Sequence, residues 1–225
     1  MEIVNCMDRM LYENNQNYFY RVLEENILEL YLEPGARISE TELAHSFNSS
    51  RSPIRSALSR LNEEGFVIIE PQKTTIVSKL NKEFIRQAGF VKYVIETELM
   101  ADIIKAGKTE TLCCVLSQAL EKFKTNDAYN MRLADEEFHG KIYEVAGREK
   151  LQSCLHVPYL HYCRIQSLQR RREVREGDFI LNHQKLIDLI GNKDLDALEQ
   201  RKRSRLERLD NIIVDAMRDY PHYFC

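Results

Sequence analysis

The chain has 225 residues, a formal net charge of −3 and 44% apolar residues, enough for one large buried core or two small ones. Residues 1–80 carry 8 Lys and Arg against 12 Asp and Glu, so no strongly basic domain indicates a nucleic-acid partner by charge alone. No apolar run reaches membrane-spanning length and the N-terminus lacks a signal-peptide pattern, so we expect a cytoplasmic protein without a membrane partner. The six cysteines show no CxxC spacing and are expected to be free thiols.

The N-terminal region begins with two predicted helices. Apolar residues at helical spacing predict a helix over 17–32, which the segment 33–35 (Glu-Pro-Gly) ends. Ser39 and Glu42 are spaced as a capping box, in which each side chain satisfies an orphan backbone N–H. This pattern predicts a short second helix that buries a few apolar residues.

A third helix and a hairpin follow. Pro53 is tolerated only in a first turn, so we place the helix over 51–64, with Gly65 just beyond its end. Two β-rich runs, 66–70 and 75–78, are separated by a polar turn and predict a hairpin. Helices followed by a hairpin within about sixty residues are typical of a winged helix-turn-helix.

The rest of the chain shows helical stripes without strand-like alternation. The predicted helices cover 82–106, 109–124, 128–146, 149–171, 178–191 and 194–217. We therefore predict a mainly α protein with two domains. Residues 1–80 form the winged helix-turn-helix with its small β-hairpin, and residues 81–225 form an antiparallel bundle of about six helices.

The helix over 51–64 has two contrasting faces. Its apolar stripe contains Ile54, Ala57, Leu58 and Leu61. The other face carries arginines and hydroxyls without an acid, namely Arg51, Arg55 and Ser59 at one-turn intervals, with Ser52 and Ser56 beside them. Arginine forks suit phosphates and the edge of guanine. The alternative is a solvated helix face with two arginines, but the neighbouring helix and hairpin favour a DNA-reading helix.

This region resembles the winged helix of the GntR family of bacterial transcription factors. The resemblance covers about residues 18–79 and is carried by 34–38 (PGARI), Glu40, 43–44 (LA), 50–58 (SRSPIRSAL), Leu61 and 64–65 (EG). It implies DNA contacts from Arg37, Arg51, Arg55 and the wing, where Thr74 stands in place of the usual Gly and Lys73 can reach a phosphate. The predicted DNA-contacting residues are Arg37, Ser50, Arg51, Ser52, Arg55, Ser59, Lys73 and Thr74.

In the second half, polar residues stand on apolar helix faces. Asp135 and His139 lie one turn apart beside an apolar stripe, His183 lies within another, and Arg205 shares an apolar face of the last helix. Burying unpaired charge is costly, so these groups should pair with one another or with a guest. Asp and two His are ligands for Zn, Ni or Mn. The alternative is that Asp135 orients His139, while His183 is an ordinary core histidine.

Residues 81–215 resemble the FCD effector domain found in one branch of the GntR family. The motifs are 95–96 (IE), Asp135 with 138–139 (FH), 146–147 (AG) with Leu151, and His183 before a final helix. The resemblance implies that Asp135, His139 and His183 hold a metal in a pocket for small carboxylates, with a basic residue near Arg164. A further family histidine falls at Arg205, which cannot ligate a metal. Either a three-ligand metal site persists, or Arg205 binds Asp135 or the ligand carboxylate directly and no metal is needed. We favour the second interpretation.

Our leading hypothesis is a regulator that binds a palindromic double-stranded DNA operator as a homodimer and responds to a small carboxylate bound in the bundle. A second hypothesis is a metal-dependent enzyme using Asp135, His139 and His183, against which no nucleophile or phosphate loop stands at recognisable spacing. A third is a constitutive DNA-binding dimer without an effector. A pocket lined by the polar groups, rather than a packed apolar core, would favour the first.

Overall fold

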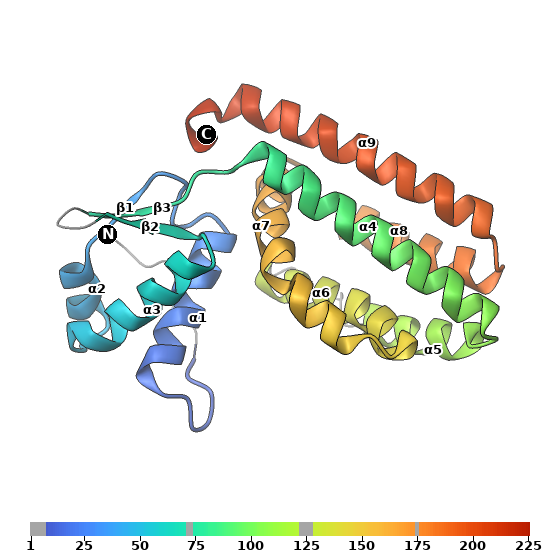
Figure 1. Ribbon diagram of the computed structural model, residues 1–225, viewed down its shortest axis with the longest axis horizontal. Coiled ribbons are helices and arrows are strands. Elements are labelled where there is room, and N and C mark those ends of the chain that lie inside the picture. Colours follow the sequence, from blue (N-terminus) through green and yellow to red (C-terminus); the bar gives the residue numbers. More distant parts are fainter. Residues whose placement is uncertain (1–7, 71–73, 122–127, 174–175) are drawn as a thin grey trace. The chain divides into compact units, whose positions relative to one another are not determined.

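The computed structural model describes residues 8–70, 74–121, 128–173 and 176–225 (Figure 1). The chain divides into two compact units. The first unit comprises residues up to Ile85 together with Leu160–Leu168 and Val214–Cys225, and the second comprises Arg86–Tyr159 and Gln169–Ile213. The predicted fold class is confirmed, because the chain is mainly helical, with a small N-terminal sheet and a C-terminal helical bundle.

The N-terminal elements follow the predicted order. They are α1 (Asn15–Leu28), β1 (Arg37–Ile38), α2 (Glu40–Ser46), α3 (Arg51–Glu63), β2 (Val67–Ile69) and β3 (Thr75–Val77). The Ser39 side chain accepts a hydrogen bond of 3.3 Å from the Glu42 backbone N–H, which is the serine half of the predicted capping box. Gly65 follows α3 with a φ of +80°, a left-handed conformation that glycine adopts without strain.

One strand, β1, is absent from the sequence-based prediction. Within the described residues the sheet has the order β1-β3-β2, and both pairings are antiparallel. Arg37 pairs with Ile76 and Ile38 pairs with Thr75. A strand of only two residues has no alternating pattern, so only its long-range pairing identifies it. The pairing attaches Arg37 to the same small sheet as the wing.

The packing of α3 fixes which of its faces meets solvent. This helix packs against α1. Its predicted apolar stripe is confirmed, since four side chains are 0% exposed, namely Ile54, Ala57, Leu58 and Leu61. Burying such side chains contributes about 1.5–3 kcal/mol each for the larger ones, which holds the rotation of the helix about its axis. The opposite face of α3 is therefore turned outward.

The helices predicted after residue 81 are all confirmed. They are α4 (Lys82–Lys105), α5 (Thr109–Leu120), α6 (Ala128–Ala146), α7 (Glu149–Glu173), α8 (Glu176–Gly191) and α9 (Leu195–Asp219). In the second unit α5 packs against both α6 and α8. The core there is built mainly from aliphatic side chains and includes Leu112, Leu116, Phe138, Ile142 and Ile190. None of the helices in the described ranges is long and apolar enough to cross a membrane.

The segment that follows the wing is hydrogen-bonded within the first unit. Arg164, 0% exposed, donates to the Ser78 hydroxyl at 3.1 Å and to the Ser78 carbonyl at 2.6 Å. The Leu80 N–H donates to the Tyr223 carbonyl at 2.8 Å, and the Cys225 N–H donates to the Leu80 carbonyl at 3.2 Å. The C-terminal residues thus lie beside this segment as a short parallel bridge. Residues 78–80 are not a loose tether.

Candidate functional site

The outer face of α3 carries the side chains that the sequence predicts for DNA contact. Ser50 occupies the N-cap position without a side-chain capping hydrogen bond, and the exposed residues that follow are Arg51, Ser52, Arg55 and Ser59. The Arg55 side chain is 68% exposed. The predicted outward orientation is therefore confirmed, and the guanidinium groups are accessible to a polyanion.

An acid that the sequence analysis did not place here lies beside Arg55. The Arg55 Nη2 donates to Glu40 Oε2 at 2.8 Å, and Nε lies 3.2 Å from the same oxygen. This hydrogen bond, followed by the charge of Glu40, raises the pKa of Arg55. Glu40 is the first residue of α2, fifteen positions before Arg55, so helical periodicity within α3 could not reveal it. A DNA phosphate that approaches Arg55 meets this carboxylate.

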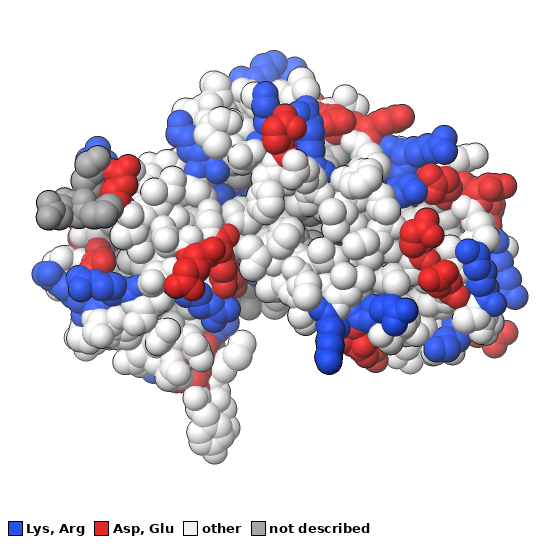
Figure 2. All heavy atoms as spheres, in the orientation of Figure 1, with Lys and Arg blue, Asp and Glu red and all other residues white. Residues whose placement is uncertain are grey.

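The wing and β1 carry the remaining predicted DNA contacts. Arg37 in β1 and Thr74, just before β3, are both exposed. Because Ile38 pairs with Thr75, these two positions lie close together on the sheet. Lys73 lies outside the described residues. Figure 2 shows Lys and Arg interspersed with Asp and Glu on the visible face, without a broad area of one sign.

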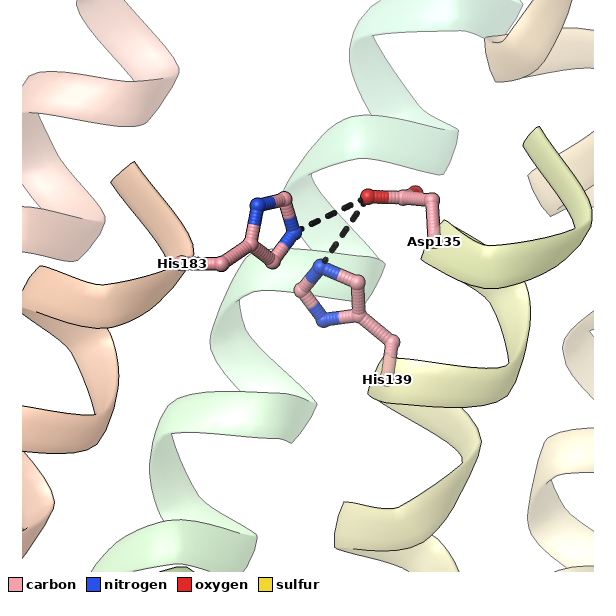
Figure 3. A group of neighbouring side chains, drawn as sticks. All are labelled: Asp135, His139 and His183. Atoms are coloured by element: carbon pink, nitrogen blue, oxygen red, sulfur yellow. Dashed lines mark hydrogen bonds and ion pairs between the residues drawn. The ribbon is translucent and has the colours of Figure 1, made fainter. Parts of the chain in front are cut away.

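In the second unit, Asp135 and His139 on α6 and His183 on α8 point toward one another (Figure 3). The His183 Nε2 donates to Asp135 Oδ1 at 3.1 Å, and His139 Nε2 lies 3.7 Å from the same oxygen. One donor atom from each of the three residues lies within 4.8 Å of the others. The predicted convergence of these three side chains is thus observed. We call these three residues the bundle triad.

Three side chains that the sequence analysis did not assign to the site surround the bundle triad. Tyr159 donates to Asp135 Oδ2 at 3.1 Å. Lys92 Nζ donates to Glu96 Oε1 at 2.6 Å, with both side chains buried. The second Glu96 oxygen lies 2.9 Å from His139 Nδ1, although this ring nitrogen is poorly aligned for a hydrogen bond. Lys92 and Glu96 are four residues apart on α4, but only the fold brings them beside α6.

Burial and neighbouring charges set the protonation of Asp135 and His139. Burial opposes ionisation of Asp135, but His139, the hydrogen bond from His183 and Lys92 outweigh it and hold the pKa of Asp135 below its usual value. Burial lowers the pKa of His139 and Lys92 adds to this effect, against the opposing charges of Glu96 and Asp135. An ionised carboxylate and a neutral imidazole are the forms that bind metals. The three donors therefore fit a divalent ion, with a fourth position left for a non-protein ligand.

The predicted arginines occupy different surroundings. Arg164 is bonded to Ser78, so the structure does not bring it to the bundle triad. Arg205 on α9 is half-buried, and within the described residues it makes no hydrogen bond or ion pair with Asp135. The pairing of Arg205 with Asp135 that the sequence suggested is therefore not observed.

Arg201 is a residue that the sequence analysis missed. It stands one turn before Arg205 on α9, is half-buried and donates to the Asn182 carbonyl at 3.0 Å. Burial, followed by the charge of Arg205, lowers the pKa of Arg201 to about 10, while Tyr93 and Glu96 oppose this shift. Because Arg201 and Arg205 are four residues apart, they lie on the same face of α9.

A pocket of about 490 Å³, including the part open to solvent, lies between α4, α6 and α7 within the second unit. Its polar lining includes Lys92, Glu96, His139 and Tyr143, and its apolar lining includes Val91, Leu155 and Pro158. His139 thus contributes to the bundle triad with one ring nitrogen and borders the pocket on its other side. The bundle contains a pocket with polar groups, not only a packed apolar core.

The N-terminal region is a winged helix with an outward arginine face, and the helical bundle contains buried polar groups and a pocket. Together these features define a DNA-binding regulator with a second domain of the ligand-binding type. Residues 16–77 match the family described as "Bacterial regulatory proteins, gntR family", and residues 91–208 match the FCD domain. The chain belongs to the GntR family, in the branch that carries an FCD domain. It is a DNA-binding transcriptional regulator and not an enzyme. The domain boundary at residue 80 stays a prediction.

Relatives of nearly the same length include named repressors. The chain is 23% identical over 212 residues to the HTH-type transcriptional repressor RspR of Escherichia coli K12, covering 91% of each chain. It is 29% identical over 202 residues to the gluconate operon transcriptional repressor of Bacillus licheniformis, covering 86% of this chain and 82% of the relative.

Solved structures show the same fold. A GntR regulator from Rhodococcus sp. RHA1 aligns with a TM-score of 0.64 at 17% identity, over 88% of this chain and 97% of that one. The E. coli McbR/YncC structure aligns with a TM-score of 0.63 at 18% identity, over 90% and 98%.

Proposed function

We propose that this regulator binds a two-fold symmetric operator as a homodimer and that a small carboxylate bound in the bundle controls this binding. The observation that carries the proposal is the pairing of an outward arginine face on α3 with a buried, hydrogen-bonded polar group and a pocket in the bundle. The gluconate operon repressor among the relatives supports control of a metabolic operon.

On the DNA side, Arg51 and Arg55 are the principal contacts. Arg51 is exposed and makes no hydrogen bond or ion pair with other described residues, so it can approach a phosphate or guanine without first losing a partner. Arg55 must break its ion pair with Glu40 before its guanidinium can contact DNA. The remaining predicted residues contact the sugar-phosphate backbone of the DNA. They are Arg37, Ser50, Ser52, Ser59, Lys73 and Thr74.

Dimerisation follows from the small footprint of one recognition helix. A single helix of this length reads only a few base pairs, whereas a two-fold pair reads two half-sites one helical turn apart. Closed two-fold symmetry is also the commonest form of oligomer. Sedimentation at micromolar concentration should therefore give twice the chain mass.

For the effector, Asp135, His139, His183 and Arg205 form the binding group. Arg205 provides a guanidinium group for the carboxylate of the effector. Hydrogen bonds between the bundle triad and the effector fix the orientation of the effector. Asp135, His139 and His183 are also the residues that would hold a divalent ion, which would supply a Lewis-acidic contact to the same carboxylate. We favour binding without the ion, because Arg205 would repel a nearby cation.

The DNA test is selection of bound sequences from a random pool, followed by affinity measurements at several salt concentrations. Arg51→Ala should weaken specific binding by about 1–3 kcal/mol and reduce the salt slope by about one. Arg203→Ala, which removes an exposed arginine from α9, is the control and should change neither. Equal losses in both variants would contradict the assignment of α3 as the reading helix.

The effector test measures melting temperature and operator affinity with a panel of small carboxylates. Arg205→Ala should weaken the effector response, expressed relative to the operator affinity of the same variant without ligand. Tight stoichiometric metal in unchelated protein would overturn the metal-free interpretation. No response to any carboxylate would favour a constitutive DNA-binding dimer.

A further inference from the structure

We propose that α7 carries the effector signal from the bundle to the winged helix and that Pro158 is the hinge at which this helix changes shape. The inference rests on the proposed function, in which a carboxylate bound in the bundle controls DNA binding. It adds the element that links the two binding events, and the contacts of α7 on either side of Pro158 identify this element.

Pro158 interrupts the hydrogen bonding inside α7. Proline has no N–H, so the Cys154 carbonyl lacks the hydrogen bond that residue 158 of a regular helix would donate, and the proline ring crowds the same carbonyl. Sharp changes of direction in helices occur mostly at such positions. The division of the chain into two units falls directly afterwards, between Tyr159 and Leu160. A weak point of α7 therefore coincides with its passage from one unit to the other.

The residues around Pro158 line the pocket of the second unit. The side chains that α7 contributes to the pocket between α4, α6 and α7 include Leu155, His156, Pro158 and Tyr159. The Tyr159 hydroxyl also donates to Asp135 Oδ2 at 3.1 Å, so this part of α7 is bonded to the bundle triad. A ligand that enters the pocket, or that changes the hydrogen bonding of Asp135, therefore acts on α7 at its weak point.

The next turn of α7 holds the C-terminal end of α3. His161 Nε2 donates to the carbonyl of Glu64, the C-cap residue of α3, at 2.8 Å. The His161 ring also stacks on Phe66, with 4.3 Å between the ring centroids. One side chain of α7 thus contacts the end of the helix that reads DNA.

Arg164, about one turn further along α7, holds the wing. It donates twice to Ser78, the residue that follows β3. Within the described residues this fully buried guanidinium makes no ion pair, and its Nε has no hydrogen-bond partner. Since burying a charge without a counterion is costly, this arrangement is not strongly favoured over one in which Arg164 shifts. A change in α7 at Pro158 therefore reaches the attachments of both α3 and the wing.

A hinge of this kind gives the two sites one shared equilibrium. The ligand favours the shape of α7 that fits its pocket, and the operator favours the shape that places α3 and the wing correctly. Each site then affects the other by the same factor. Restoring the missing hydrogen bond should fix one shape of α7, so that the two sites bind independently.

The first arm of the test removes the hinge with Pro158→Ala, which supplies the N–H that the Cys154 carbonyl lacks. Operator affinity is measured with and without acetate or succinate, at concentrations that calorimetry shows to be saturating for each variant. We expect the active acid to change operator affinity roughly tenfold or more in the wild-type protein, but by less than about twofold in Pro158→Ala. The variant should melt at a higher temperature than the wild type, because alanine favours the helix that proline interrupts.

The second arm needs no ligand. Asp135→Asn keeps the size of the side chain but weakens the acceptor for Tyr159, so it disturbs α7 from the bundle side. We expect this substitution to change operator affinity roughly fivefold or more in the protein with Pro158, but by less than about twofold in the Pro158→Ala background. Tyr159→Phe removes the donor of the same hydrogen bond and replaces Asp135→Asn if that variant does not fold.

Ser153→Ala is the matched control, because Ser153 is an exposed residue of the same helix. This substitution also raises the helix propensity of α7 but adds no backbone hydrogen bond. It should retain the wild-type response to the carboxylate and to Asp135→Asn. Equal suppression by Ser153→Ala and Pro158→Ala would attribute the effect to helix propensity and would overturn the hinge.

The outcomes separate this inference from the proposed function. If a carboxylate changes operator affinity equally in the wild type and in Pro158→Ala, effector control survives and the hinge is overturned. If neither acid acts on the wild type, the response to Asp135→Asn decides alone. An equal change in both backgrounds, or no change in either, overturns the hinge, whereas suppression by Pro158→Ala supports it although control by these carboxylates has failed.

Discussion

The outer face of α3 and the polar interior of the bundle use charge in opposite ways. On α3, Arg51 and Arg55 are exposed, and Arg55 has a single acidic neighbour that it can exchange for another anion. In the bundle, Lys92 and Glu96 are buried with each other, and Asp135 is hydrogen-bonded by two side chains. Exposed charges contribute little to folding and remain available for a partner. Buried charges must be paired before any partner arrives, so their removal affects the fold first.

The largest effect should come from breaking the Lys92–Glu96 pair. Glu96→Ala leaves a buried ammonium group without its partner, which should lower the free energy of unfolding by about 3–5 kcal/mol. Urea denaturation measures this loss. The added substitution Lys92→Met should recover much of it, because no unpaired charge then remains.

A surface pair of the same length is the control for this prediction. Lys202 and Glu199 also lie 2.6 Å apart, but the Glu199 side chain is 38% exposed, against 6% for Glu96. Glu199→Ala should hardly change the urea midpoint. Similar losses for Glu96→Ala and Glu199→Ala would contradict the distinction between buried and exposed charge.

A smaller effect should follow from protonation of His161, a half-buried histidine of the first unit. Its ring stacks on Phe66 at 4.3 Å and its Nε2 donates to the Glu64 carbonyl at 2.8 Å. Burial, aided by the charge of Arg164, lowers the pKa of His161 to about 4, while the hydrogen bond to Glu64 opposes this shift. The unfolded chain, with a pKa near 6.5, therefore binds the proton first, so stability falls as pH drops below 6.5.

Between pH 7.5 and 5.5 this histidine should remove roughly 1 kcal/mol of stability, measured by urea denaturation at each pH. His161→Phe keeps an aromatic ring on Phe66 but cannot titrate, so the difference between wild type and variant isolates the effect. The prediction is wrong if the two proteins lose the same stability over this range.

The smallest change in stability should come from Glu40→Gln, at the start of α2 beside the exposed face of α3. The substitution removes the carboxylate beside Arg55, so the urea midpoint should hardly move. Operator affinity should rise a few-fold, because Arg55 no longer exchanges an acid for a phosphate, and the gain should be greatest at low salt. Glu42→Gln removes an exposed acid from α2, the helix that also carries Glu40, and is the comparison. An equal gain from both variants would indicate a general charge effect instead of release of Arg55.

Local sequence patterns were sufficient for the helices and their faces. The spacing of Ile54, Leu58 and Leu61 predicted the rotation of α3, and the structure buries all three. The same reasoning brought Asp135, His139 and His183 together, since each stands beside an apolar stripe. Periodicity is informative where one helix meets one core.

Contacts between distant elements were not predictable in this way. Glu40 beside Arg55 depends on how α2 meets α3, and β1 depends on pairing with a strand nearly forty residues later. Arg201 is half-buried and donates to the Asn182 carbonyl on α8, a contact that the spacing within α9 alone does not show. Arg164 was assigned to the pocket by resemblance alone, whereas its guanidinium is occupied by Ser78.

The bridge between Leu80 and the C-terminal residues has a consequence for measurements of motion. The Leu80 amide hydrogen should exchange slowly with deuterated solvent, because the Tyr223 carbonyl holds it. Any rearrangement of the segment after the wing must open this bridge and release the Cys225 amide with it. Paired acceleration of exchange at these two amides, on adding operator or effector, would therefore report the switching motion directly.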